Sequence, residues 1–363
     1  MVPLLDLRPL QEGHALRGIG RYVRTLASAL SFEEAVVWAD LPVPDVARGI
    51  RVVHKVPGAP APGRLGWVLD SLRTPPHASR LVHLPVADSR LGRPAPQVVT
   101  GHDAIPWRFA ADYPAGKLGR LRMRRDAAVA RRADVVIAPS AKSAEDLARY
   151  CGVRESALSV VHHAAGPPWP EPSPGSGRAA PEATRRGRRY VVAAGGFTHI
   201  DPRKRLFDLI EALPGLPDDV GLVVTGATGP LAAPFLSRAK AKDVADRVEL
   251  TGQVADAELV ELYAGAAAFA FPSAWEGFGL PLLEAMSVGL PCVVADGGAL
   301  SEVAGGAATV VPVGDTDALT GALVELLADG RRAALASAKA TARAAHFTMQ
   351  RFAEGHLRVY EWT

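Results

Sequence analysis

The chain has 363 residues, of which 48% are hydrophobic and 22% charged, and its formal net charge is +3. This length suits two domains with buried cores. The small, dispersed excess of positive charge and the scarcity of aromatic residues argue against a nucleic-acid-binding protein. Two distant cysteines, Cys151 and Cys292, form no metal or redox motif and indicate a reducing compartment.

The start of the chain, MVPLLDLRPLQEGH, has no basic residues ahead of an apolar core, so it does not read as a signal peptide. The apolar runs, such as AGAAAFAF, are shorter than the roughly 18 to 20 residues that span a bilayer. We therefore expect a cytoplasmic protein, with peripheral contact to the inner membrane face left open.

Short apolar strands alternate with helical stretches along the chain. In the first half, strands are expected at PLLDL, AVVWAD, RVVHKV, RLVHLP, QVVTGHD and DVVIAPS, with helices at RYVRTLASAL and in a long arginine-rich segment. In the second half, strands are expected at YVVAAGG, GLVVTG, RVELTG, AFAFPS, PCVVAD and ATVVPV, with helices at RLFDLIEAL, AELVELYAG and PLLEAMSVG. Continuous apolar strands alternating with helices are typical of parallel sheets covered on both faces. The pattern predicts an α/β protein with two doubly wound, Rossmann-like domains facing across a cleft.

Residues 166–189 differ from the rest in composition. They are rich in Pro, Gly, Ser and Arg and have almost no apolar periodicity. We expect a linker or a disordered loop between the two domains.

The segment PSAWEGFGLPLLE carries two glutamates, Glu276 and Glu284, with seven residues between them. Gly277 and Gly279 allow backbone N–H groups to approach an anion closely, and Pro281 suits the first position of a helix. The positive end of that helix would face a phosphate group. Glu284, expected in the first helical turn, could bind a ribose diol, and Glu276 a sugar. The alternative is an ordinary strand–turn–helix connection with a solvated glutamate.

The segment YVVAAGGFTHIDPRKRLFDLIEAL places Arg203 and Lys204 between a glycine turn and a helix. Cations at a helix N-terminus oppose the helix dipole, so an anionic ligand would explain them. The alternative is a plain basic helix start.

The segment RGIGRY carries Gly18 and Gly20, and Asp40 follows about 20 residues later, which superficially suggests a dinucleotide fingerprint. The third glycine is absent, and ten residues separate the first strand from Gly18. We therefore reject a dinucleotide site. In QVVTGHD, the strand ends beside His102 and Asp103, where a parallel sheet places its ligands.

These motifs together resemble one family. EGFGLPLLE, followed by SVGLPCVVADGGALSEVAGGAA, resembles the E-x7-E region of the family 4 retaining glycosyltransferases of GT-B fold. DPRKR is similar to the PRK segment of that family, and VVTGHD resembles its T-x-H-D segment. GIGRY resembles a segment of its mannosyltransferase-like branch. TGQVADAEL is similar to the loop that receives the nucleobase.

The resemblance implies a division of the chain and a set of roles. Residues 1–165 would bind the acceptor, residues 190–345 the nucleotide sugar, and a C-terminal helix at 346–363 would return to the N-terminal domain. The implied catalytic residues are His102, Arg203, Lys204 and Glu276. The implied donor-binding residues are Gly18, Gly20, Arg203, Lys204, Val254, Glu276, Gly277, Phe278, Gly279, Leu280 and Glu284. Asp103 and Arg21 are implied acceptor contacts.

The implied reaction transfers a sugar with retention from a nucleoside diphosphate sugar to a glycan, glycolipid or natural-product acceptor. GDP-mannose is the favoured donor, with dTDP-rhamnose and UDP-sugars as alternatives, and neither a metal nor a cofactor is expected. Other hypotheses are a nucleotide-sugar 2-epimerase, a glycoside hydrolase that uses Glu276 and Glu284 as an acid–base pair, and a non-catalytic nucleotide-sugar-binding partner subunit.

The arginine-rich helix has two interpretations. A solvated basic face is the simpler one, and contact with anionic lipid or a phosphorylated acceptor is the other. Its basic residues are Arg120, Arg122, Arg124, Arg125, Arg131 and Arg132.

Overall fold

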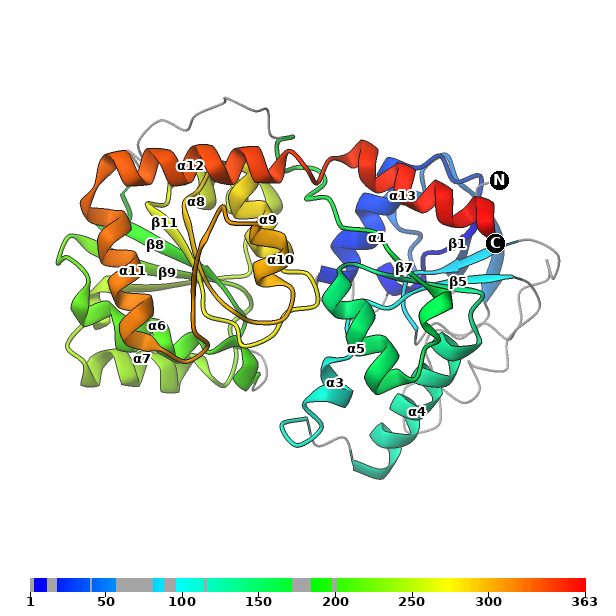
Figure 1. Cartoon of the computed structure of the whole chain (residues 1–363), viewed down its shortest axis with the longest axis horizontal. Helices are drawn as coiled ribbons and strands as arrows, with labels where there is room; N and C mark the ends of the chain where they lie inside the picture. Colours follow the sequence, from blue (N-terminus) through cyan, green and yellow to red (C-terminus); the bar gives the residue numbers. More distant parts are fainter. Residues whose placement is uncertain are drawn as a thin grey trace. The chain divides into compact units, whose positions relative to one another are not determined.

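A computed structural model describes residues 3–11, 18–39, 41–56, 81–87, 96–113, 116–171, 184–197 and 201–363. The chain forms two compact units, each built on one parallel sheet with helices on both faces (Figure 1). Unit 1 comprises Met1–Ala164 and Met349–Thr363, and unit 2 comprises Ala165–Thr348. The prediction of two doubly wound α/β domains is confirmed. Asp40 lies outside the described residues.

Unit 1 contains a seven-stranded sheet of order β3-β2-β1-β4-β5-β6-β7, in which all neighbours are parallel. Its strands are β1 (Leu4–Asp6), β2 (Glu34–Trp38), β3 (Arg51–Val56), β4 (Val82–Leu84), β5 (Gln97–Thr100), β6 (Val135–Ala138) and β7 (Leu158–Val160). Its helices are α1 (Gly18–Ala29), α3 (Ile105–Arg108), α4 (Gly116–Arg132), α5 (Ala141–Cys151) and α13 (Met349–Trp362), with short 3-10 helices at Arg8–Gln11, Asp45–Ala47 and Glu155–Ala157. The sequence does not predict β7, because this edge strand is only partly buried.

Helices cover both faces of the unit 1 sheet in the described part of the chain. Buried residues of α1 and α13, such as Leu26 and Phe352, share one core with Val37, and α13 lies beside α1 in Figure 1. Residues of α4 and α5, such as Ala127 and Leu147, form the core of the opposite face. The C-terminal helix therefore belongs to unit 1.

Unit 2 contains a six-stranded parallel sheet of order β10-β9-β8-β11-β12-β13. Its strands are β8 (Arg189–Ala194), β9 (Val220–Thr225), β10 (Val248–Gly252), β11 (Ala268–Phe271), β12 (Cys292–Ala295) and β13 (Thr309–Val311). Its helices are α6 (Leu206–Ala212), α7 (Ala232–Ala241), α8 (Asp256–Gly265), α9 (Leu280–Ser287), α10 (Leu300–Ala304), α11 (Thr316–Ala328) and α12 (Gly330–Ala344), with 3-10 helices η4 (Pro202–Lys204), η5 (Leu213–Gly215) and η6 (Ala245–Arg247). Helices α6, α7 and α11 cover one face, and α8, α9, α10 and α12 cover the other.

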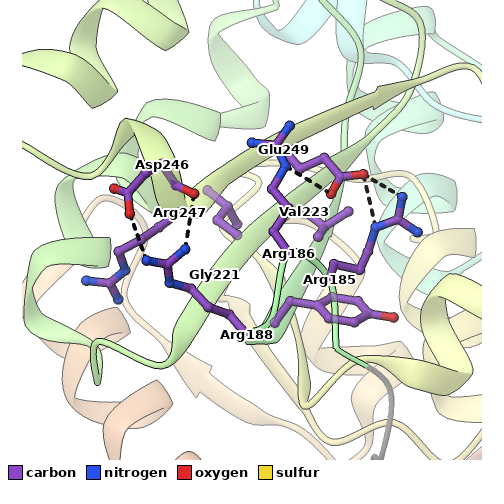
Figure 2. Close-up of a pocket in the computed structure, with 10 residues that line it drawn as sticks. Arg185, Arg186, Arg188, Gly221, Val223, Asp246, Arg247 and Glu249 are labelled. Atoms are coloured by element: carbon purple, nitrogen blue, oxygen red, sulfur yellow. Dashed lines mark hydrogen bonds and ion pairs between the residues drawn. The ribbon is translucent and has the colours of Figure 1, made fainter.

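The end of the expected linker is part of unit 2. Arg185 and Arg188 form a backbone bridge, and Arg189 already belongs to β8. The side chains of Arg185 and Arg188 pair with Glu249 and Asp246, so this turn is bound to the segment that forms β10 (Figure 2). Basic residues that look like linker by composition thus cover the amino-end edge of the sheet. Residues 172–183 lie outside the described residues.

Helices of the described part of the chain are all too short or too polar to cross a bilayer. Cys151 and Cys292 are both buried.

Candidate active site

The candidate site in unit 2 is built around the loop that follows β11. The backbone of Glu276 forms an isolated β-bridge with Gly298, which follows β12. The next residue, Ala299, donates its N–H to the Glu276 carbonyl at 2.9 Å. Gly298 has a φ of +65°, and a Cβ atom there would lie 2.4 Å from the Glu276 carbonyl oxygen. Only glycine allows this approach. The segment after β12 therefore fixes where Glu276 lies.

The carboxylate of Glu276 is buried and surrounded by donors. Lys204 Nζ lies 2.7 Å, Arg203 Nη1 3.2 Å and the Ser273 hydroxyl 2.6 Å from the same oxygen, Oε1. Burial acts to raise the pKa of Glu276, but the two positive charges and the hydrogen bonds outweigh burial, so its pKa lies below the ordinary value. Glu276 is therefore ionised and accepts hydrogen bonds at neutral pH.

Arg203 and Lys204 differ in their exposure and in their partners within the protein. The Arg203 guanidinium donates to Asp201 Oδ2 at 2.8 Å and to the Trp275 carbonyl, and its side chain is 11% exposed. The Lys204 side chain is 23% exposed, and its ammonium lies 5.0 Å from the centre of the Phe271 ring. Lys204 is thus the more accessible cation, whereas Arg203 also holds the loop before Glu276 in place.

Helix α9 begins directly after the glycine turn. Its N-cap, Gly279, has a φ of +96°, and a Cβ atom there would lie 2.6 Å from Leu300. Within the part of the chain that the structure describes, the amide N–H groups of Gly279 and Leu280 donate no hydrogen bond. These amides at the positive end of a helix are suited to an anion.

Two expected positions at the start of α9 are wrong by about one residue. The helix begins at Leu280, so Pro281 occupies its second position rather than the first. Glu284 consequently lies in the second turn and is 4% exposed. The reason is that Gly279, in the left-handed region, ends the loop earlier than the proline suggests.

Three loops of the site share one edge of the sheet. Arg203 and Lys204 follow β8, Val254 follows β10, and Glu276 follows β11. Because the strands are parallel, their carboxyl ends meet at this edge. The structure thus brings Arg203, Lys204 and Glu276 into direct contact and places half-buried Val254 at the same edge.

Gly277 and Phe278 lie in unit 2, in the turn before α9, and both are buried. The other predicted residues belong to unit 1. Helix α1 begins at Gly18, which is exposed, whereas Gly20 is buried and Arg21 half-buried. His102 lies just beyond β5, and its Nε2 lies 2.8 Å from the Pro85 carbonyl oxygen. Asp103 Oδ1 accepts the N–H of Ile105 at 2.9 Å and so helps to begin α3.

Sequence reasoning missed several residues that shape the site. Ser273 is fully buried and donates to Glu276, and Asp201 holds Arg203. Tyr22 packs edge-on against His102 with ring centres 4.9 Å apart. The first two lie within three residues of a predicted site residue, which is the signal that could have identified them. No pattern in the sequence pairs Tyr22 with His102.

In the described part of the chain, no group of three or more His, Cys, Asp or Glu side chains is placed to hold a metal ion.

Each of the two units matches a known protein family. Residues 16–165 match "Glycosyltransferase Family 4", and residues 188–329 match "Glycosyl transferases group 1".

Individual glycosyltransferases are also similar to this chain in sequence. The chain is 33% identical over 393 aligned residues to D-inositol 3-phosphate glycosyltransferase of Xylanimonas cellulosilytica, covering 94% of this chain and 91% of that protein. It is 31% identical over 182 residues to O-antigen chain mannosyltransferase B of Escherichia coli, covering 48% of each protein. The match thus spans only about half the length of the E. coli relative.

Among solved structures, sucrose-phosphate synthase of Thermosynechococcus elongatus superposes with a TM-score of 0.77 at 19% identity, covering 99% of this chain and 98% of that one. This likeness concerns the fold.

Proposed function

Because the chain belongs to the family 4 glycosyltransferases, we propose that it transfers a sugar from a nucleoside diphosphate sugar to an acceptor hydroxyl with retention of configuration. The observation that carries the proposal is the contact of Lys204 and Arg203 with Glu276 beside the amides of Gly279 and Leu280. Cations and amides suit a diphosphate, and the carboxylate suits sugar hydroxyls.

The proposed step needs no side-chain base. The bond from the anomeric carbon to the β-phosphate oxygen breaks, and the acceptor oxygen bonds to that carbon on the same face. The acceptor proton passes to the departing phosphate oxygen. Lys204, Arg203 and the amides of α9 stabilise the negative charge that develops on the phosphate. Glu276, and His102 of unit 1, would contact the sugar.

GDP-mannose is the donor we favour, because mannosyltransferases recur among the relatives; dTDP-rhamnose and UDP-sugars are the alternatives. We place the base beside Val254 and the ribose at Glu284. The acceptor is a glycan, glycolipid or natural product, in the neighbourhood of Asp103 and Arg21.

The exposed half of α4 supports a peripheral membrane contact for a cytoplasmic enzyme. Leu118 is 40% and Leu121 49% exposed. Lys117, Arg120 and Arg124 flank them and are exposed, and no residue in the described ranges forms an ion pair with these three cations. Paired leucines among cations suit the surface of an anionic bilayer.

The test is calorimetric titration of the full chain with GDP, UDP and dTDP, each with and without Mg²⁺. Tight binding of one nucleotide without Mg²⁺ is expected and would identify the base. Binding of none of them would overturn the donor site. A glycoside hydrolase would instead cleave simple glycosides without nucleotide; the lowered pKa of Glu276 makes it unsuited to be the acid of such a pair.

A further inference from the structure

Five side chains of unit 1 form a continuous buried chain of hydrogen bonds, and each of these residues is at most 4% exposed. They come from four elements: Tyr22 of α1, His83 of β4, Thr100 of β5, and His356 and Tyr360 of α13. Tyr22 Oη lies 2.8 Å from Thr100 Oγ1 and 2.9 Å from His356 Nε2. His83 Nε2 lies 2.8 Å from Thr100 Oγ1, and His83 Nδ1 lies 2.6 Å from Tyr360 Oη.

The protons in this chain can be assigned from its end. His356 Nδ1 lies 2.8 Å from the Phe352 carbonyl oxygen, which only accepts, so Nδ1 carries the proton. Both imidazoles are neutral, because burial lowers the pKa of His356 to about 4 and that of His83 well below its ordinary value. His356 Nε2 therefore accepts the hydroxyl proton of Tyr22.

The remaining links then have one solution. The Tyr22 proton is used on His356, so Thr100 donates to the Tyr22 oxygen. The Thr100 oxygen must in turn accept from His83 Nε2, which leaves His83 Nδ1 to accept from Tyr360. Every hydroxyl and ring N–H donates once, in one direction, from Tyr360 to the Phe352 carbonyl.

One member of this hydrogen-bond chain, Tyr22, contacts the ring of a proposed site residue. The Tyr22 ring lies edge-on to His102, with centres 4.9 Å apart and an interplanar angle of 83°. His102 follows Thr100 by two residues, and Pro85, whose carbonyl accepts from His102 Nε2, follows His83 by two. Strands β4 and β5, which carry His83 and Thr100, therefore also lead directly into Pro85 and His102.

We propose that Tyr22, His83, Thr100, His356 and Tyr360 are positioning residues that fix the orientation of the His102 imidazole at the carboxyl end of β5. The proposal rests on the proposed sugar contact of His102. Helix α13 would then contribute to the orientation of His102 as well as to packing, because both ends of the hydrogen-bond chain, Tyr360 and the Phe352 carbonyl, lie on this helix.

The proton assignment is tested by long-range ¹H–¹⁵N NMR of the full chain labelled at its 10 histidines, with His83→Gln and His356→Gln to assign the signals. At neutral pH we expect His83 protonated at Nε2 and His356 at Nδ1. The opposite tautomer or a charged ring at either residue would overturn the hydrogen-bond chain. This measurement does not depend on activity.

The positioning role is tested with Tyr22→Phe, which removes the hydroxyl and keeps the ring. We expect kcat to fall by about 10- to 100-fold, as for a misoriented catalytic group. In a His102→Ala background, the same substitution should cause no further loss. Tyr190→Phe is the matched control: its hydroxyl is also buried and donates to the Leu262 carbonyl, at 2.8 Å, but in unit 2. Its kcat should not change.

A wild-type kcat for Tyr22→Phe would overturn the positioning role. The same holds if Tyr22→Phe lowers kcat by the same factor in the His102→Ala background as in the wild type. Full transfer by His102→Ala alone would refute the proposed sugar contact together with the positioning role. A wrong tautomer pattern would refute the hydrogen-bond chain alone.

Discussion

Lys204 and Glu276 are 72 residues apart in the sequence, yet Lys204 Nζ lies 2.7 Å from Glu276 Oε1. Their loops follow β8 and β11, which are neighbours in the unit 2 sheet. A buried carboxylate is costly without a positive partner, so this ion pair holds the site together before a ligand binds. A bound diphosphate would compete with Glu276 for the same ammonium group.

Replacing Lys204 with alanine should reduce transfer by about 100- to 1,000-fold, the loss typical of one group that stabilises developing charge. The chain should still fold, because Arg203 and Ser273 remain beside Glu276. The measurement is the rate of nucleotide release from the donor, with circular dichroism to follow folding.

Lys242→Ala is the matched control for this substitution. Lys242 Nζ also lies 2.7 Å from a glutamate, Glu211, but at the surface of unit 2. It should keep normal activity. Normal transfer by the Lys204 variant would refute the phosphate assignment.

Replacing Glu284 with glutamine should mainly weaken nucleotide binding. The change removes the charge of a carboxylate proposed to bind the ribose, and hydrogen bonds to charged groups contribute about 1.5–3 kcal/mol. The dissociation constant should therefore rise by about 10- to 100-fold, as measured by calorimetry. Glu325→Gln, on the exposed surface of α11, should bind normally. A reduced kcat with unchanged affinity would place Glu284 at the reacting atoms instead.

Gly298→Ala should destabilise unit 2 and impair transfer together. A Cβ atom at Gly298 would lie 2.4 Å from the Glu276 carbonyl oxygen, and the backbone is in the left-handed region. We expect a loss of at least about 2 kcal/mol in the free energy of unfolding.

Gly321→Ala gives the opposite expectation and serves as the control. Gly321 lies inside α11, and a Cβ atom there would meet nothing within 4 Å. Alanine should stabilise this helix by about 0.5–1 kcal/mol, as measured by denaturant unfolding. If both variants lose stability equally, the close approach at Gly298 does not matter.

Part of the site could be predicted because its residues directly follow the carboxyl ends of strands. Parallel strands bring their carboxyl ends together, so Lys204 and Glu276 could be assigned to one site from local patterns alone. The network of Tyr22, His83 and His356 could not, since its partners come from elements far apart in the sequence. The turn at Arg185 looked like linker because its basic residues have no periodicity; its structure depends on carboxylates from β10 and η6.

Acid should destabilise unit 1 well above the pH at which carboxylates titrate. Burial lowers the pKa values of His83 and His163 well below 6.5 and that of His356 to about 4. The unfolded chain binds protons at these residues below about pH 6.5, whereas the folded chain does not, so stability falls as the pH falls. At one pH unit below its pKa in the unfolded chain, each such histidine lowers the free energy of unfolding by about 1.4 kcal/mol.

The measurement is calorimetric unfolding between pH 7.5 and 5.5, where the melting temperature should drop. The ion pairs of Glu276 do not contribute in this range: its folded pKa lies below 4.5, so their stabilisation is lost only in stronger acid. A melting temperature that stays constant or rises over this range would show that the buried histidines do not limit stability.

Replacing Leu118 and Leu121 together with serine should weaken binding to anionic vesicles. The two leucines lie three residues apart on α4, so they share one face, and both are exposed beside basic residues. Sedimentation with vesicles that contain phosphatidylglycerol should show binding of the wild type that neutral vesicles do not support and that salt reduces. Leu335→Ser, at a leucine of α12 that is 59% exposed in unit 2, should bind like the wild type. Equal binding by the Leu118/Leu121 variant, or no binding by the wild type, would leave the basic face of α4 as a solvated surface.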